Sequence, residues 1–288
     1  MITKRKIIYF LLLIGIILAV VGFVVLYDIV RFQTTKISFL DVGQGDAILI
    51  SHGTNQILID GGSSPKVLME ELGKQMPFWD RTIEIVVATH PDSDHINGLV
   101  SVFDYYNINQ FWHTNASKDT SIYKTLINRA HNEKGVEDML VFNGLRAILD
   151  EGIFLDVIYP FDDNMSEISE INDTSIVTLL SVGDKKFYFG GDLTSEIEDN
   201  LPINEKITVL KAGHHGSANS TSEKFLDKVK PTSVIISVGK DNHYGHPHEK
   251  VVKRIENNGA IIYRTDINGT VTYNCDKNFN CKVIIERD

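Results

Sequence analysis

The chain begins with a short basic segment, followed by an apolar run long enough to cross a bilayer. Lys4, Arg5 and Lys6 precede residues 7–27, which contain no charged residue. A helix rises about 1.5 Å per residue, so this run matches the roughly 30 Å hydrocarbon core. It is longer than the core of a signal peptide, about 7–15 residues, and ends without a small-residue cleavage site. We therefore expect an uncleaved transmembrane helix over 7–27, with a cleaved signal peptide as the alternative.

Charge on either side of this run predicts its orientation. Three cations precede it, whereas Asp28 and Arg31 follow it with opposing charges. Positively charged flanks tend to stay in the cytoplasm. We expect residues 1–6 to be a cytoplasmic N-terminus, residues 28–35 a linker, and residues 36–288 an extracytoplasmic domain at the cell membrane.

Beyond the linker, short apolar runs alternate with turn residues and a few helical stretches. No internal repeat and no Gly/Ser-rich or Pro-rich linker interrupts residues 36–288, which predicts one domain. The expected strands are 36–42, 46–51, 56–60, 83–89, 153–159, 175–182, 186–190, 207–212 and 233–238. The expected helices are 64–75, 95–105, 120–134, 222–229 and 248–257, and residues 161–173 read as a surface loop. This order predicts an α/β fold in which outer helices sandwich two sheets.

Composition narrows the class of protein. The 288 residues are 43% hydrophobic and 23% charged, with a formal net charge of −10. These values exclude a disordered chain, and the acidic balance argues against a protein that coats nucleic acid, which needs a concentrated basic surface. Two cysteines are too few for a disulfide-built scaffold or a structural zinc ribbon. The composition is compatible with an enzyme that meets phosphates through a metal.

The strongest chemical signal lies in residues 89–95, between an expected strand and an expected helix. Its potential ligands are His90, Asp92, Asp94 and His95. Imidazole nitrogen and carboxylate oxygen are ligands that Zn²⁺, Mn²⁺ and Fe²⁺ accept. The alternative is a solvated turn in which Asp94 caps the helix.

Two more polar clusters follow other expected strands. Gly-Gly-Asp ends one strand at Asp192, and Ala-Gly-His-His-Gly-Ser ends another around His214 and His215. Asp192 alone could be a helix cap, but a His pair flanked by glycines is harder to explain that way, because glycine lets the backbone approach an ion closely. Three such clusters at strand ends predict a dinuclear metal site.

These motifs resemble the metallo-β-lactamase superfamily, and more closely the extracytoplasmic hydrolase domain of the ComEC DNA-uptake (competence) proteins. The spacing from His90 to His95 is similar to the superfamily motif His-x-His-x-Asp-His, with Asp92 at the second His. Segments 39–46, 59–62, 211–217, 244–248 and 263–266 look like the other motifs of the ComEC domain. The resemblance covers about residues 37–275 and implies an αββα sandwich with its site along one edge.

The resemblance also implies a ligand set for two divalent ions. One ion would be held by His90, Asp92 and Asn172, the other by Asp94, His95 and either His214 or His215, with Asp192 bridging the two. The superfamily's third-motif His has no counterpart between His131 and Asp192, and Asn172 lies in that segment. Because the ligands are rich in carboxylates and lack a thiolate, Mn²⁺ competes with Zn²⁺.

Catalytic roles follow from the same resemblance. Asp94 would orient the attacking water, and His215 and His246 are candidates for binding phosphate or protonating the leaving group. For His246 the alternative is a simple turn before a helix. Asp60 could orient a metal-binding His through its other ring nitrogen, and Asp46 could support the site in a similar way.

Three functions remain open at this stage. The first is a metal-dependent phosphodiesterase or nuclease of the ComEC type, with single-stranded DNA as a candidate substrate. The second is a metallo-hydrolase of another bond, such as an envelope choline-phosphate ester, a lactone or a lactam. The third is a non-catalytic metal-stabilised surface domain, which the number of retained ligands disfavours. A single span cannot form a DNA pore, so a separate channel protein is a candidate partner, and the oligomeric state is open.

The cations that could form a nucleic-acid-binding cluster in the last eighty residues are Lys211, Lys240, Lys250, Lys253, Arg254 and Arg264. Cys275 and Cys281 lie between two strand-like runs, and opposed positions in a hairpin are close enough for a disulfide after modest adjustment. We expect this bridge to form, the alternative being two free thiols.

Overall fold

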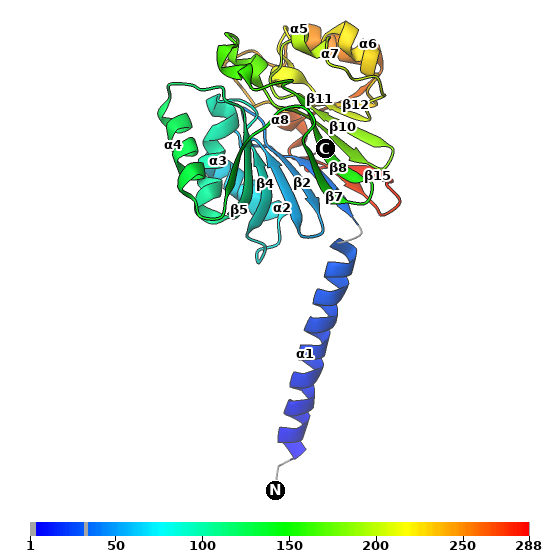
Figure 1. The fold of residues 1–288 in the computed structure, drawn as a ribbon. Coiled ribbons are helices and arrows are strands. Elements are labelled where there is room, and N and C mark those ends of the chain that lie inside the picture. Colours follow the sequence, from blue (N-terminus) through cyan, green and yellow to red (C-terminus); the bar gives the residue numbers. More distant parts are fainter. Residues whose placement is uncertain (1–3, 32–33, 288) are drawn as a thin grey trace.

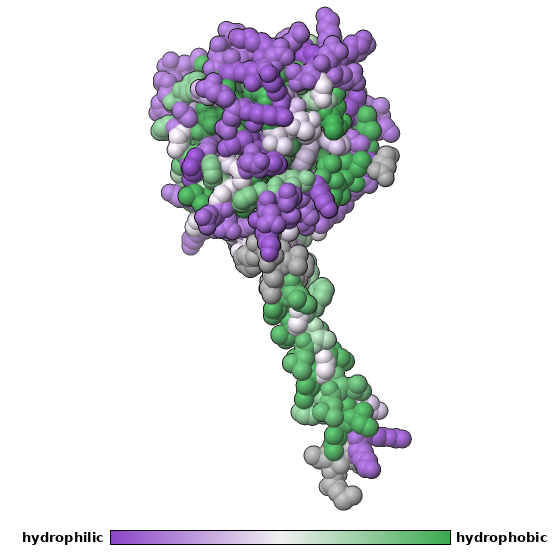
Figure 2. Space-filling model, turned by 90° about the vertical axis from the view of Figure 1, so that its right-hand side faces the viewer, coloured by the Kyte–Doolittle hydropathy of each residue, from purple (hydrophilic) through white to green (hydrophobic). Residues whose placement is uncertain are grey.

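A long helix stands apart from the rest of the chain in the computed structural model, which describes residues 4–31 and 34–287 (Figure 1). This helix, α1 (Lys4–Arg31), runs beyond the expected end at Tyr27, because residues 28–31 include no Gly or Pro that would end it. Its apolar side chains from Ile7 to Leu26 are exposed and form an apolar column beneath a mostly polar domain (Figure 2). By length and composition α1 could span a membrane. Residues 1–3 of the expected N-terminus and 32–33 of the expected linker lie outside the described residues.

The first sheet has the strand order β15-β14-β1-β2-β3-β4-β5-β6. Its strands are β1 (Thr35–Phe39), β2 (Ile48–His52), β3 (Asn55–Ile59), β4 (Thr82–Val87), β5 (Asn107–His113), β6 (Glu137–Leu140), β14 (Val271–Cys275) and β15 (Cys281–Ile285). Strands β3 to β6 are parallel, and the pairs from β15 to β3 are antiparallel.

The second sheet has the order β13-β12-β11-β10-β9-β8-β7. Its strands are β7 (Arg146–Asp150), β8 (Ile153–Tyr159), β9 (Val177–Val182), β10 (Lys185–Phe189), β11 (Val209–Lys211), β12 (Ser233–Ile236) and β13 (Ile261–Arg264). Strands β10 to β13 are parallel, and β7 to β10 are antiparallel.

Helices cover the outer face of each sheet. The first sheet is covered by α2 (Pro65–Gln75), α3 (Ser93–Tyr105) and α4 (Ser121–Asn132), whose apolar faces join one buried cluster. The second is covered by α5 (Ser195–Glu198), α6 (Glu223–Val229) and α7 (Glu249–Asn258), and α8 (Thr265–Asn268) follows β13. Helix α2 starts where it does because the Ser64 hydroxyl accepts from Val67 N and Pro65 occupies the first helical position.

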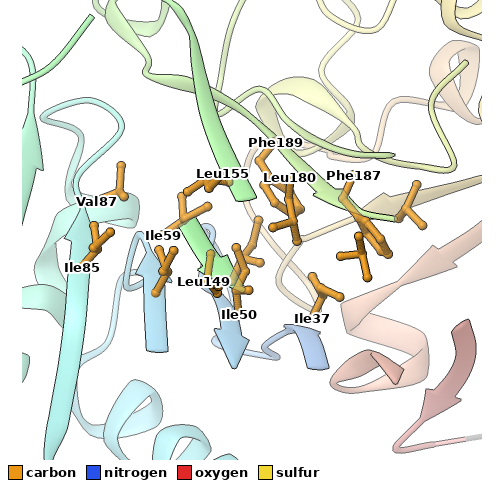
Figure 3. Close-up of a cluster of buried hydrophobic side chains, with 14 of the residues drawn as sticks. Ile37, Ile50, Ile59, Ile85, Val87, Leu149, Leu155, Leu180, Phe187 and Phe189 are labelled. Atoms are coloured by element: carbon orange, nitrogen blue, oxygen red, sulfur yellow. The ribbon is translucent and has the colours of Figure 1, made fainter. Parts of the chain in front are cut away.

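The main core lies between the two sheets (Figure 3). Successive side chains of a strand point to opposite faces, so Ile37 and Ile50 face this core while Leu49, on the same strand as Ile50, faces the helices. The second sheet contributes Phe187 and Phe189 from the opposite side. Helix, sheet, sheet and helix therefore stack in four layers, which confirms the expected αββα sandwich.

Several elements were not expected from the pattern. Strands β5, β6, β7 and β13 are absent from the expected set, and the expected loop 161–173 contains two short 3-10 turns, Asn164–Glu167 and Ile171–Thr174. Strand β5 reads Asn-Ile-Asn-Gln-Phe-Trp-His, and its polar residues obscure the alternation of apolar and polar positions that is typical of a strand.

The expected disulfide is present: Cys275 and Cys281 are directly paired across β14 and β15 and are bonded to each other.

Candidate metal centre

The candidate site lies at one edge of the sandwich, where six strands end. Short connections after β1, β3 and β4 bring residues from the first sheet, and connections after β10, β11 and β12 bring residues from the second. The residues in question are Asp46, Asp60, His90, Asp94, His95, Asp192, His214, His215 and His246. Because carboxyl ends of parallel strands share an edge, residues as far apart in sequence as Asp46 and His246 meet there.

Backbone conformation sets two of these loops. Gly45 has φ +111°, and a Cβ there would overlap the carbonyl of Asp94, so glycine is needed for the two loops to touch. His214 and His215 both have left-handed φ values of 46° and 53°. Non-glycine residues rarely adopt this conformation, and such strain is characteristic of functional sites.

Several side chains converge on a common space. His90, His95 and Asp192 place one ligand atom each within 4.8 Å of one another, and so do Asp94, His95 and His215. Asp192 Oδ2 lies 3.2 Å from Nε2 of both His95 and His215. A third such group consists of Asp46, Asp192 and His215. Because these groups share His95, Asp192 and His215, they form one continuous centre.

The three imidazoles are oriented by bonds to their other ring nitrogen. His95 Nδ1 donates to Asp60 Oδ2 at 2.7 Å, and His215 Nδ1 donates to the carbonyl of Ser237 at 2.9 Å. A carboxylate and a carbonyl only accept, so both Nδ1 atoms carry hydrogen. His90 Nδ1 lies 3.1 Å from Thr89 Oγ1, whose own hydrogen goes to Asp60 Oδ2.

Each ring therefore turns its Nε2 toward the centre. The Nε2 atoms of His90, His95 and His215 are buried and have no hydrogen-bond partner among the described residues. Metal-ligating histidines usually have this arrangement, in which Nδ1 donates to a carboxylate or carbonyl and Nε2 is left for the ion. The residues present thus fit a divalent metal centre.

The centre is held in an ionised state by its neighbours. Burial alone would raise the pKa of Asp192, but His215, His95 and Lys211 hold it well below the usual range. Burial alone would lower the pKa of His95, but the carboxylates of Asp192 and Asp60 raise it well above the ordinary value. These buried carboxylates attract positive charge, and a divalent cation bound there would displace the proton from His95 Nε2.

Lys211 was missed as a site residue by sequence reasoning. Its side chain is fully buried, its ammonium contacts Asp46 Oδ2, and it lies 3.4 Å from Asp192 Oδ1. It also donates to the Gly191 carbonyl at 2.9 Å. The signal available in the sequence was a lysine near the end of a strand-like run, three residues before the His pair. Lys211 therefore neutralises buried carboxylates and is not part of a nucleic-acid-binding cluster.

The expected ligands do not all join the central groups. Asp92 Oδ1 lies 2.7 Å from Lys118 Nζ instead. Asn172 Nδ2 lies 3.4 Å from His214 Nδ1, so the structure brings it to His214 and not to His90. His214 is closer to solvent than the fully buried His215, with its Nε2 3.9 Å from Asp192 Oδ2.

His246 lies at the entrance to the centre. Its ring centroid is 5.4 Å from that of His214, and Tyr244, which is 67% exposed, stacks on it at 5.9 Å.

Neither Asp94 nor Asp192 is a helix cap, because the N-cap of α3 is Asp92 and that of α5 is Thr194. Asp94 and Asp192 are thus available to the centre.

Comparison with known proteins agrees with this geometry. The model of the metallo-beta-lactamase superfamily matches residues 40–240. ComE operon protein 3 of Bacillus subtilis is 27% identical over 271 residues, covering 83% of this chain and 33% of that protein. Recombination protein 2 of Haemophilus influenzae is 29% identical over 257 residues, covering 87% and 30%. Both are ComEC-type competence proteins, and the chain spans about a third of their length.

Solved structures share the fold at low sequence identity. The metallo-beta-lactamase fold protein YhfI from Bacillus subtilis is 10% identical with a TM-score of 0.57, covering 84% of this chain and 99% of that one. CmlA, a diiron beta-hydroxylase from Streptomyces venezuelae, is 12% identical with a TM-score of 0.53, covering 83% and 53%. With the matched sequence model and the four-layer fold together, the chain belongs to the metallo-β-lactamase superfamily.

Proposed function

We propose that the protein is a membrane-anchored, extracytoplasmic, metal-dependent phosphodiesterase or nuclease. The observation that carries the proposal is the convergence of three buried Nε2 atoms, which have no hydrogen-bond partner among the described residues, with the carboxylates of Asp94 and Asp192. Such a set can bind two divalent ions, which when bound would activate a water and neutralise charge on a phosphoryl group. With three imidazoles, carboxylates and no thiolate, Mn²⁺ and Zn²⁺ are the metals we propose.

In this proposal the protein's own residues divide the work. His90, His95, His215, Asp94 and Asp192 hold the ions, and Asp94, whose Oδ2 receives a 3.5 Å contact from Gln44 Nε2, also orients the attacking water. Asp92 and Asn172 remain proposed ligands whose contacts in the structure are Lys118 and His214. Burial and the neighbouring His215 and His214 lower the pKa of His246 to about 4, so His246, beside His214 at the entrance, is proposed to bind the phosphate through a neutral imidazole N–H.

A phosphodiester is favoured as substrate by groups at the entrance. Lys118 is 43% exposed and pairs with Asp92, which lies in sequence between His90 and Asp94, so we propose that it binds a phosphate there. Tyr244 offers an exposed aromatic face on which a base can stack. The two relatives are ComEC-type competence proteins, and one is named a recombination protein, which supports single-stranded DNA as the proposed substrate.

The test of the function is metal analysis and hydrolysis by the purified full chain. We expect about two equivalents of metal after reconstitution with Mn²⁺ or Zn²⁺. We also expect cleavage of bis-p-nitrophenyl phosphate and single-stranded DNA that stops when the metal is removed by a chelator. Cleavage of a lactone, lactam or choline-phosphate ester without cleavage of either phosphodiester would contradict the substrate class. Absence of metal and of all hydrolysis would contradict the enzyme.

Location is tested separately. The basic residues Lys4, Arg5 and Lys6 at the start of α1 favour a cytoplasmic N-terminus. Protease added to intact protoplasts should therefore digest the domain and leave α1 protected. Protection of the whole chain, with digestion only after lysis, would reverse the proposed topology.

A further inference from the structure

Three exposed aromatic side chains lie at the edge of the domain opposite the metal centre. Phe78 is 79% exposed and Trp79 is 52% exposed, in the loop between α2 and β4, and Tyr105 at the end of α3 is 63% exposed. The rings of Phe78 and Trp79 pack edge-on, with centroids 4.8 Å apart. Large aromatic side chains gathered at one exposed place mark a contact surface. We call these three residues the aromatic edge.

The loop that carries Phe78 and Trp79 is bonded to the segment that follows α3. Asn107 N donates to the Arg81 carbonyl at 2.7 Å, which ties the end of the loop to the residues just after α3. The guanidinium of Arg81 also lies 5.7 Å from the centroid of the Tyr106 ring. The loop and the end of α3 therefore lie side by side, so the three exposed aromatic residues lie on neighbouring segments at one edge of the domain.

The membrane helix joins the domain at this same edge. Strand β1 follows α1 and starts at the edge where β3 and β4 also start. Neighbouring strands are about 4.8 Å apart, so the start of β4 is about 14 Å from the start of β1. The end of α1 is also close to the start of β1, because the four Cα steps from Arg31 to Thr35 cover at most about 15 Å. Figure 1 shows the loop between α2 and β4 projecting from the side of the domain from which α1 leaves.

We propose that the aromatic edge enters the lipid interface beside α1, so that the metal centre faces away from the bilayer. This inference rests on the membrane anchoring proposed above. Tryptophan and tyrosine favour the interface because an apolar ring there carries one polar N–H or O–H group. Strand β4, six residues long, separates the aromatic edge from His90 by about 20 Å. Substrate would then reach the centre from the aqueous side.

Tryptophan fluorescence tests this inference directly. The chain has two tryptophans, Trp79 and Trp112, and Trp112 is buried in the core at 1% exposure. The full chain is reconstituted in phosphatidylcholine vesicles with and without lipid spin-labelled near the headgroup. We expect the spin label to lower Trp79 emission about twofold or more, since an interfacial ring lies at the depth of the label. Trp79→Phe should remove the quenched component.

A matched control reports on the opposite edge. In the Trp79→Phe background, Tyr244→Trp places an indole at the entrance to the metal centre, where the native ring is 67% exposed. Its emission should be quenched by aqueous acrylamide and unaffected by spin-labelled lipid. Quenching of this indole by the lipid would overturn the proposed orientation.

Vesicle flotation separates this inference from the anchor. If the chain does not float with the vesicles, the anchor itself is contradicted, and with it the inference. If the chain floats but spin-labelled lipid leaves Trp79 emission unchanged, the anchor stands and the aromatic edge does not touch lipid. Protection of Trp79 from acrylamide without quenching by the lipid would mean that protein, such as a second copy of the chain, covers the edge.

Discussion

Asp60 and His95 form a fully buried pair beneath the metal centre, in which His95 Nδ1 donates to Asp60 Oδ2 at 2.7 Å. Asp60 also accepts from the backbone N and the hydroxyl of Thr89, so its position is fixed by three donors. Asp60 thus holds the imidazole with Nε2 toward the centre. It is a positioning residue, because it acts through His95.

Asp60→Asn should weaken metal binding, because an amide orients the imidazole less well than a carboxylate does. Losses of about 10–100-fold in affinity are typical for such partners. Equilibrium dialysis of the full chain against Mn²⁺ or Zn²⁺, with elemental analysis, measures the change. The matched control is Asp138→Asn. Asp138 Oδ1 likewise bonds a histidine, His113 Nε2, at a distance of 2.8 Å, but this pair lies outside the metal centre. Equal affinity in both variants would refute the role of Asp60.

Asp94→Asn should abolish hydrolysis and leave folding nearly unchanged, because Asp94 is proposed to orient the water while the core strands stay packed. Assay on bis-p-nitrophenyl phosphate and thermal unfolding measure the two effects. Asp104→Asn is the control, since Asp104 lies on the same helix α3 and pairs with Arg129 at the surface. More than about a tenth of wild-type activity in Asp94→Asn, a change under 1.4 kcal/mol, would contradict the role.

Asp192→Ala should reduce metal occupancy to one ion or fewer, because this carboxylate is proposed to bridge two positions. Its Oδ2 faces both His95 and His215 at 3.2 Å. Elemental analysis of the reconstituted variant measures occupancy. Two retained equivalents would show that Asp192 does not bridge.

Lys211→Met should destabilise the fold by about 3–5 kcal/mol, because removing one partner of a buried ion pair leaves a charge uncompensated. Here two carboxylates, Asp46 and Asp192, would lose their lysine. Urea unfolding of the metal-free chain measures the loss. Lys186→Met is the control: Lys186 pairs with the half-exposed Glu205 at 3.4 Å, and such surface pairs contribute about 0–1 kcal/mol. Equal effects would mean that the Lys211 ammonium is not needed for folding.

Glu198→Gln should flatten the pH dependence of stability. Burial raises the pKa of Glu198 to about 8, so the folded chain keeps a proton that the unfolded chain loses near the ordinary pKa of 4.5. Stability should therefore fall as pH rises from about 5 to 8, by at most about 1.4 kcal/mol per pH unit. The variant lacks this loss and should gain stability over wild type across that window.

Thermal unfolding of wild type and Glu198→Gln at pH 5, 6.5 and 8 measures the difference in stability, because these pH values span the window between the ordinary pKa of 4.5 and the raised pKa of about 8. Glu196→Gln, on the exposed face of the same helix α5, is the control and should follow wild type. A difference between Glu198→Gln and wild type that stays constant with pH would contradict the prediction.

The sequence by itself determined the apolar helix, most of the strands and the chemical identity of the site. Uninterrupted apolar length predicts α1, and β-branched runs ended by turn residues predict strands such as β4 and β8, because these signals are local. The ligand types are also local, since His90, Asp94 and His95 lie within six residues. The sequence did not predict strand β5, because its polar residues are accommodated by neighbours that lie far away in sequence.

Only the tertiary structure decided which polar residues face the centre. His214 and His215 are adjacent in sequence, but the bond from His215 Nδ1 to the carbonyl of Ser237, which directly follows β12, turns that ring inward. Lys211 resembles a surface cation until Asp46, from the other sheet, is brought against it. Likewise, Trp79 and α1 share an edge only because strand order places β1 and β4 in one sheet. Contacts of this kind depend on the packing of distant segments, which spacing along the chain does not record.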